Sequence, residues 1–137
     1  MPDIIHLEIV TPERLLLEAD VDSVQVPGLD GELGILPGHS PLISELKPAG
    51  LLTYVQGSVS HQLLVSSGFV EVMPDRVKIL AEIAERPDEV DLDRAFKAKE
   101  RAEKLLLQAT GDPTVDAEAA AMALERATAR IQIAGKK

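Results

Sequence analysis

Arginines and acidic residues in the last third of the chain have a spacing that could hold a polyphosphate. Arg94 and Arg101 are seven residues apart, which is two turns along one face of a helix, and a second arginine pair further on is spaced four apart. If the two segments fold side by side, their guanidiniums gather. Guanidiniums bind phosphate oxygens through charge-assisted, partly bidentate hydrogen bonds, and nearby carboxylates can accept hydrogen bonds from ribose or adenine. The residues concerned are Glu85, Asp91, Arg94, Arg101, Arg126 and Arg130.

The same charges also fit an ordinary solvated helix surface. Glu100, Glu103 and Glu125 are interspersed with the arginines and could pair with them. Exposed pairs of this kind are common and weak. Residue types alone therefore leave both interpretations open.

The histidines and serines do not form a recognisable catalytic or metal-binding pattern. His6, His39 and His61 are far apart, none lies in an HxxxH or HExxH spacing, and the chain has no cysteine. A Ser-His-acid triad could use Ser40 or Ser67, but no G-x-S-x-G sequence surrounds either. We predict no catalytic residue, no metal site and no enzyme activity.

The elements that must position these side chains differ between the two parts of the chain. Up to Glu85, apolar residues alternate or cluster in short runs, as in Ile5, Leu7 and Ile9, and glycine or proline interrupts them every few residues to a dozen. This rhythm predicts an antiparallel β-sandwich or barrel. Gly57-Ser58 and Asp75-Arg76 are expected to be hairpin turns.

Two further segments rich in glycine, proline and serine are expected to be irregular. The run from Val24 to Leu42 is interpreted as a rigid connection between strands, because its glycines and prolines constrain the backbone. It lacks the Gly-Lys-Ser/Thr of a phosphate-binding loop. Ser66-Ser67-Gly68 is interpreted as a turn.

From Pro87 onward the apolar period becomes helical. One helix is expected to end before Gly111-Asp112-Pro113, and a second to begin with Asp112 as its cap and Pro113 at its first position, continuing to about Ile131. The facing stripes are rich in alanine, which favours an antiparallel helical hairpin with closely packed backbones. Burying an alanine methyl contributes under ~1 kcal/mol, against roughly 1.5–3 for leucine. We therefore expect a β-sandwich domain over residues 1–86 and a loosely held two-helix hairpin over residues 87–137.

Composition narrows the classes of partner. The 137 residues carry a net charge of −9, and residues 1–85, with 13 acidic and 4 basic side chains, account for all of it. Nucleic-acid binding relies on clustered basic and aromatic residues, so it is not expected. No apolar run approaches the ~20 residues of a membrane-spanning helix, which predicts a soluble or peripheral protein.

Several motifs in this order resemble the epsilon-subunit family of bacterial F-type ATP synthases. They are Thr11-Pro12, the run VPGLDGELGILPGHSPL from Val26 to Leu42, SGFVEV from Ser67, and VKILAE from Val77. The resemblance covers nearly the whole chain.

The resemblance implies a function as well as a fold. In that family the sandwich docks against the gamma subunit and the c-ring, which helps to couple proton flow to rotation. The hairpin either folds onto the sandwich or extends towards the alpha/beta head and blocks ATP hydrolysis. Such a subunit needs no cofactor, and it is peripheral on the cytoplasmic face of the bacterial cell membrane, held there only through the complex.

Bacterial members of the family can bind ATP on the hairpin, as a regulatory ligand, through a motif of the form Ile/Leu-Asp-x-x-Arg-Ala. The matching sequence here is Val90-Asp91-Leu92-Asp93-Arg94-Ala95, with valine in place of the larger aliphatic residue. The resemblance implies an ATP site made of Glu85, Val90, Asp91, Arg94, Ala95, Arg126 and Arg130.

A second interpretation belongs to another class of protein. The chain could be a stand-alone β-sandwich that binds a small ligand, or serves as an adaptor, and signals through its helical tail. Gamma and c-ring subunits would then not accompany it.

Overall fold

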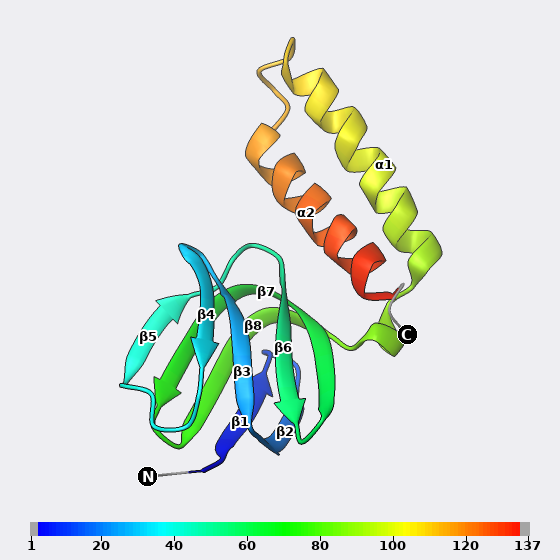
Figure 1. Cartoon of the computed structure of the whole chain (residues 1–137). Helices are drawn as coiled ribbons and strands as arrows, with labels where there is room; N and C mark the ends of the chain where they lie inside the picture. The colour runs from blue at the N-terminus through cyan, green and yellow to red at the C-terminus, as the bar shows by residue number, and fades with distance from the viewer. Residues whose placement is uncertain (1–2, 135–137) are drawn as a thin grey trace.

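The computed structural model describes residues 3–134, which form a β-sandwich followed by a helical hairpin that stands on one end of it (Figure 1). The strands are β1 (Ile5–Val10), β2 (Leu15–Val21), β3 (Ser23–Gly28), β4 (Gly31–Ile35), β5 (Leu42–Glu45), β6 (Gly50–Gln56), β7 (Val59–Met73) and β8 (Arg76–Glu85). A short 3-10 turn, η1 (Pro87–Glu89), leads into the helices α1 (Leu92–Ala109) and α2 (Ala117–Ala134).

One continuous sheet makes the sandwich, with strands in the order β2-β1-β8-β7-β6-β3-β4, and β5 pairs with β7. The expected all-antiparallel arrangement is correct for every pair except β1 and β8, which run parallel. The exception arises because β1 lies between its hairpin neighbour β2 and the last strand, β8, which runs in the same direction as β1. The sheet curls around its buried face (Figure 1), and the amide of Asp22, the residue between β2 and β3, donates to the carbonyl oxygen of Val55 in β6.

The alternation read from the sequence places the main core inside the curled sheet. Ile5, Leu7 and Ile9 are fully buried, and the residues between them face outward. The core contains side chains from seven of the strands, all except β5. Its members include Val24, Val26, Ile35, Leu52, Val65, Val70, Val72, Val77 and Ile79.

The two predicted hairpins exist, and one turn lies a residue earlier than expected. Gln56 pairs with Val59, which confirms Gly57-Ser58 as a turn. Met73 pairs with Arg76, so the second turn is Pro74-Asp75 and not Asp75-Arg76. Proline at the first central position of a turn supplies the required φ angle.

Two segments expected to be irregular consist largely of strand, although residues 36–41 are irregular as expected. The run from Val24 to Leu42 contains most of β3 and all of β4, joined by a tight turn at Leu29-Asp30. Ser67 and Gly68 lie inside β7, where both have positive φ, at 54° and 120°, and kink the strand without ending it. A Cβ on Gly68 would lie 1.9 Å from the carbonyl oxygen of Leu80, so glycine is needed there for close strand approach.

The kink lets β7 pair with a different strand along each half of its length. Its first half pairs with β6 and its second half with β5, while β8 pairs with both halves.

The helical hairpin forms as predicted, but the second helix begins later. α2 starts at Ala117, and Asp116 caps it by accepting a hydrogen bond from the amide of Ala119 at 3.0 Å. Asp112 instead accepts hydrogen bonds from the amide and hydroxyl of Thr114, which lowers the pKa of Asp112 and builds a turn before the helix. The side chain of an aspartate that turns back on its own loop competes with its use as a helix cap.

Alanines form the seam between the two helices. Ala95 and Ala102 are the buried residues of α1, and Ala120 and Ala127 face them from α2. Larger apolar side chains on α1 remain partly exposed, among them Leu92, Phe96, Leu105 and Leu107. The seam is therefore narrow.

The hairpin rests on the sandwich through a second apolar cluster, separate from the main core. Near its C-terminal end, α2 contributes Ala129, Ile133 and Ala134, which pack against Leu64 and Val90. Ala49 and the partly buried Leu51 complete this cluster, which we call the docking cluster. The loop between the helices points away from the sandwich (Figure 1). In the described range no helix is long and apolar enough to cross a membrane.

Candidate functional site

A polar cleft of about 440 Å³ lies where the end of β8, the η1 turn and both helices meet. It is lined by Glu85, Glu89, Asp91, Arg94, Ala95, Ala98, Arg101 and Arg130. Three carboxylates and three guanidiniums therefore surround one opening.

Local helix-starting signals position the acidic residues of the cleft. Asp91 is the N-cap of α1, and its carboxylate accepts from the amide of Arg94 at 3.1 Å. Glu89 caps η1 by accepting from the amide of Arg86 at 2.8 Å. Both arrangements satisfy amides that a helix leaves without partners at its start.

An ion pair across the cleft joins the sandwich to α2. The Nε and one terminal nitrogen of Arg130 donate to the same Glu85 oxygen, at 2.9 and 2.6 Å. The two side chains are 26% and 21% exposed, which strengthens the contact relative to a fully solvated pair. This pair closes the hairpin against the last residue of β8.

Further polar contacts tie the segment between β8 and α1 to the sandwich. Arg14, near the start of β2, donates to Glu89 at 2.8 Å, and Arg86 donates to the carbonyl oxygen of Leu16 at 2.6 Å. Burial would raise the pKa of Glu89, but hydrogen bonds from Arg86 and Arg14 outweigh it, and the pKa is lowered. Glu89 is therefore ionised at neutral pH and holds the entry to the hairpin.

Five of the seven predicted ligand residues lie together in the cleft: Glu85, Asp91, Arg94, Ala95 and Arg130. Val90 does not line it, because its side chain is buried in the docking cluster. Arg126 is partly buried on α2, one turn from Arg130, and is not among the lining residues.

Two residues of the cleft, Glu89 and Ala98, were not predicted, and Arg101 was predicted from spacing but is not in the ligand set that the resemblance implies. Arg101 was recognisable from its seven-residue spacing to Arg94. Glu89 stands three residues after Arg86, the spacing of a capping box, but arginine is not the Ser or Thr that marks this motif in a sequence, so the pattern could not have located it. Ala98 is one turn from Arg94, and its small side chain keeps the cleft open.

The cleft has the chemistry of an anion site. Within residues 3–134, Arg94 and Arg101 take part in no recorded ion pair, whereas the cleft's carboxylates all accept hydrogen bonds already. Guanidiniums without a carboxylate partner can bind phosphate. No pair of a nucleophile and a base is found among the lining side chains.

These features define a class of protein: a β-sandwich carrying a lightly docked helical hairpin. Residues 4–87 match the family model described as the ATP synthase delta/epsilon chain β-sandwich domain, and residues 88–135 match the long α-helix domain of the same chain. The chain belongs to this delta/epsilon family of ATP synthase subunits.

Individual relatives agree with the family. An ATP synthase epsilon chain from Halalkalibacterium halodurans is 48% identical over 132 residues, which cover 96% of this chain and 98% of the relative. One from Solibacter usitatus is 46% identical over 138 residues and the full length of both chains. A chain in the cryo-EM structure of the Euglena gracilis mitochondrial ATP synthase, OSCP/F1/c-ring, is 26% identical with a TM-score of 0.80, covering 94% of this chain and 80% of that one.

Membership of the family decides between the two interpretations of the sequence. The chain is a non-catalytic subunit of the ATP synthase complex and a component of its central stalk. The stand-alone sensor or adaptor, unrelated to rotary motors, is therefore the wrong interpretation.

Proposed function

We propose that this subunit couples the rotor to the catalytic head and restrains ATP hydrolysis through its hairpin, whose position depends on ATP. In this proposal the sandwich docks on the gamma subunit and the c-ring, and the extended hairpin reaches the alpha/beta head. Proton flow through the c-ring is then transmitted past the subunit to the head. The subunit would lie at the cytoplasmic face of the bacterial cell membrane, attached only through the complex.

The observation that carries the proposal is the weak attachment of the hairpin. The docking cluster contains only one large side chain from α2, Ile133, and the seam between the helices is made of alanines. Burying an alanine methyl contributes under ~1 kcal/mol, so most of the seam adds little. A hairpin held in this way can leave the sandwich when another surface binds it better.

The cleft suggests why ATP would keep the hairpin folded. Its walls come from β8, η1, α1 and α2, so a ligand that bridges them binds the compact hairpin and not the extended one. Its volume of about 440 Å³ lies in the range of small-molecule sites. Arg94 and Arg101 can take phosphate oxygens, while Glu85 and Asp91 retain lone pairs that accept hydrogen bonds from hydroxyl or amino groups.

The size of the effect follows from linkage. A ligand that binds only the folded hairpin stabilises it by RT ln(1 + [L]/Kd), which is about 2.7 kcal/mol at a hundredfold excess over Kd. This is comparable to the burial of one or two leucine-sized side chains. Nucleotide concentration could therefore decide the position of a hairpin held by so small a cluster.

Calorimetric titration of the purified full chain with ATP tests the ligand. We expect one-to-one binding by the wild type and at least about tenfold weaker binding by Arg94→Gln, because a charge-assisted contact to phosphate contributes about 1.5–3 kcal/mol. Lys97→Gln, which removes a positive charge from the exposed face of the same helix, is the matched control and should bind normally. Absence of ATP heat at millimolar nucleotide would refute the ATP site.

Deleting residues 87–137 tests the restraint independently. In the assembled enzyme, removal of the hairpin should raise ATP hydrolysis, whereas unchanged hydrolysis would refute inhibition by the hairpin. The truncated subunit should still copurify with gamma and c-ring subunits, since the proposal assigns that docking to the sandwich.

A further inference from the structure

Four polar side chains gather on the outer face of the β1–β2 ladder. His6 is paired in register with Asp20, and Glu8 with Glu18. Because residues two apart in a strand share a face, all four point away from the core that Leu7 enters from the other side. Two adjacent strands thus present one imidazole and three carboxylates to the same spot.

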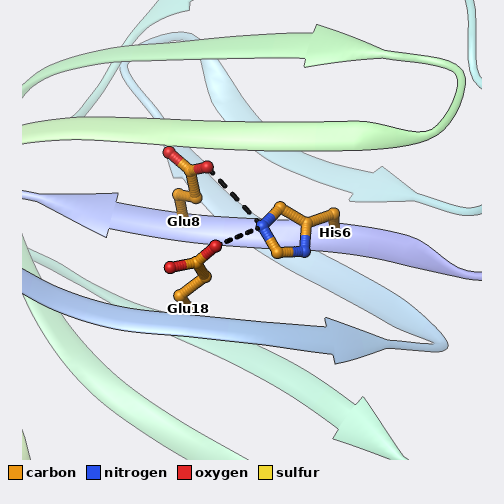
Figure 2. Close-up of side chains that lie close together, drawn as sticks. All are labelled: His6, Glu8 and Glu18. Carbon is orange, nitrogen blue, oxygen red and sulfur yellow. Dashed lines mark hydrogen bonds and ion pairs between the residues drawn. The ribbon is translucent and has the colours of Figure 1, made fainter.

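The imidazole lies between two of the carboxylates. Figure 2 shows Nε2 of His6 directed at Glu8 and Glu18, with separations of 3.5 and 3.0 Å from one oxygen of each. The three ligand atoms all lie within 4.8 Å of one another. The side chains are partly exposed, at 36% for His6, 27% for Glu8 and 51% for Glu18, so solvent reaches the spot.

Asp20 fixes the other side of the ring. Its carboxylate lies 3.0 Å from Nδ1 of His6, so an Nδ1–H of the ring donates a hydrogen bond to it. This leaves Nε2 as the ring atom that meets the two glutamates. A carboxylate behind a histidine in this way is the arrangement that orients metal-binding imidazoles in proteins.

A neutral His6 in this tautomer would direct an Nε2 lone pair at two negative charges. The spot therefore favours an occupant with positive charge, either a proton on Nε2 or a cation. A proton and a metal ion would compete for the same nitrogen.

The separations suit a metal ion. Zinc bonds to histidine nitrogen and carboxylate oxygen are about 2.0–2.2 Å, which places the ligand atoms of a tetrahedral site roughly 3.3–3.5 Å apart. The distances from Nε2 to the two glutamate oxygens, 3.5 and 3.0 Å, are near this value, whereas the two glutamate oxygens lie within 4.8 Å of each other and would move closer on binding. Small rotations of two exposed carboxylates would complete the geometry.

We propose that His6, Glu8 and Glu18 bind a divalent transition-metal ion of the Zn²⁺ type, with Asp20 as the residue that orients the ring. One imidazole with two carboxylates is a donor set that suits Zn²⁺ better than Mg²⁺ or Ca²⁺, which prefer oxygen ligands alone. Water fills the remaining coordination position.

Such an ion would fasten an edge of the sheet. β2 ends the strand order, and Glu18 is the ligand that it would contribute, while His6 and Glu8 come from the neighbouring β1. Arg76 and Lys78 of β8 pair in register with His6 and Glu8, so the positive charges beside the site are on the other flank of β1. The chain has no cysteine and so cannot form a disulfide; a bound metal ion would instead link β1 to β2.

Titration of the purified full chain with Zn²⁺ alone, followed by calorimetry and thermal unfolding, tests the site. We expect one-to-one binding and a higher melting temperature with Zn²⁺ that EDTA reverses. His6→Gln should weaken binding at least about tenfold, and Asp20→Asn by about 10–100-fold, the usual effect of losing a residue that orients a ligand. His39→Gln and His61→Gln are matched controls and should leave binding unchanged.

Circular dichroism of each variant shows whether it remains folded, and these exposed positions should tolerate the substitutions. Equal Zn²⁺ binding by wild type and His6→Gln would overturn the proposal, because the ion would then sit on other surface carboxylates or histidines. Absence of Zn²⁺ binding would also overturn it and would leave a proton as the occupant of Nε2.

Discussion

Replacing Ile133 with alanine should detach the hairpin while leaving the sandwich folded. Ile133 is fully buried, and it is the only large side chain that α2 places in the docking cluster. Isoleucine-to-alanine changes in protein interiors cost about 2–5 kcal/mol. We expect the lower part of that range, about 2–3 kcal/mol, because the docking cluster is small and its alanines retain some exposure.

This free energy corresponds to a roughly 30- to 150-fold shift towards the undocked hairpin, since each 1.4 kcal/mol is a factor of ten. Hydrogen exchange followed by mass spectrometry measures the shift. Amides of α1 and α2 should exchange faster by about that factor, because isolated helices of this length are marginal in water. Amides of β7 and β8 should keep the protection of the wild type, because the main core does not include Ile133.

Leu107→Ala is the matched control. Leu107 is 76% exposed on α1, so its loss should change exchange very little. Two results would refute the reasoning: unchanged exchange of the helices in Ile133→Ala, or an equal loss of protection in β7 and β8. The second result would mean that hairpin and sandwich unfold as one cooperative unit.

Three other substitutions test local features. Gly68→Ala should lower the free energy of unfolding in urea by about 3 kcal/mol or more, because the φ of Gly68 is 120° and a Cβ there would overlap a backbone carbonyl. Gly34 has open space around it, so Gly34→Ala is the control and should change stability little. Asp91→Ala should reduce hairpin stability by about 1 kcal/mol in the hydrogen-exchange assay through loss of the N-cap, and an unchanged exchange rate would contradict that role. Glu89→Gln should destabilise the chain in urea unfolding at neutral pH by removing the ion pair with Arg14. The folded state lowers the pKa of Glu89, so the wild type has this extra stability above the ordinary pKa of about 4.5 and loses it as pH falls through the lower folded pKa. The unfolding free energies of wild type and Glu89→Gln should therefore converge in acid. A difference that stays constant with pH would contradict the assignment.

The sequence was sufficient for the architecture because its periodicities are local. Alternation around Leu7 and the helical period after Pro87 each report one local element, and the strand and the two helices form as predicted. Conformations that depend on a neighbouring strand were missed. Ser67 and Gly68 look like turn residues, but their positive φ angles produce a kink inside β7 that is needed for its approach to β8.

The same distinction holds for the two sites. Arg94 and Arg101 could be grouped because a helix places residues seven apart on one face. Their meeting with Glu85 and Arg130 follows from how the hairpin docks, and there the resemblance to a family supplied what spacing did not. His6 and Glu18 meet only because β1 and β2 pair in one particular register, which no spacing motif for metal ligands describes.

The parallel pairing of β1 with β8 also bears on how the chain is made. His6 pairs with Arg76, which is synthesised only after most of the sandwich. During translation, β1 therefore cannot pair with β8 until β8 has been synthesised. Contacts between residues so distant in the sequence make folding of the sandwich slow. The helices that follow form through contacts between residues close together in the sequence. During that interval a chaperone that shields the nascent β1–β2 ribbon would protect the apolar side of Ile5, Leu7 and Ile9 from aggregation.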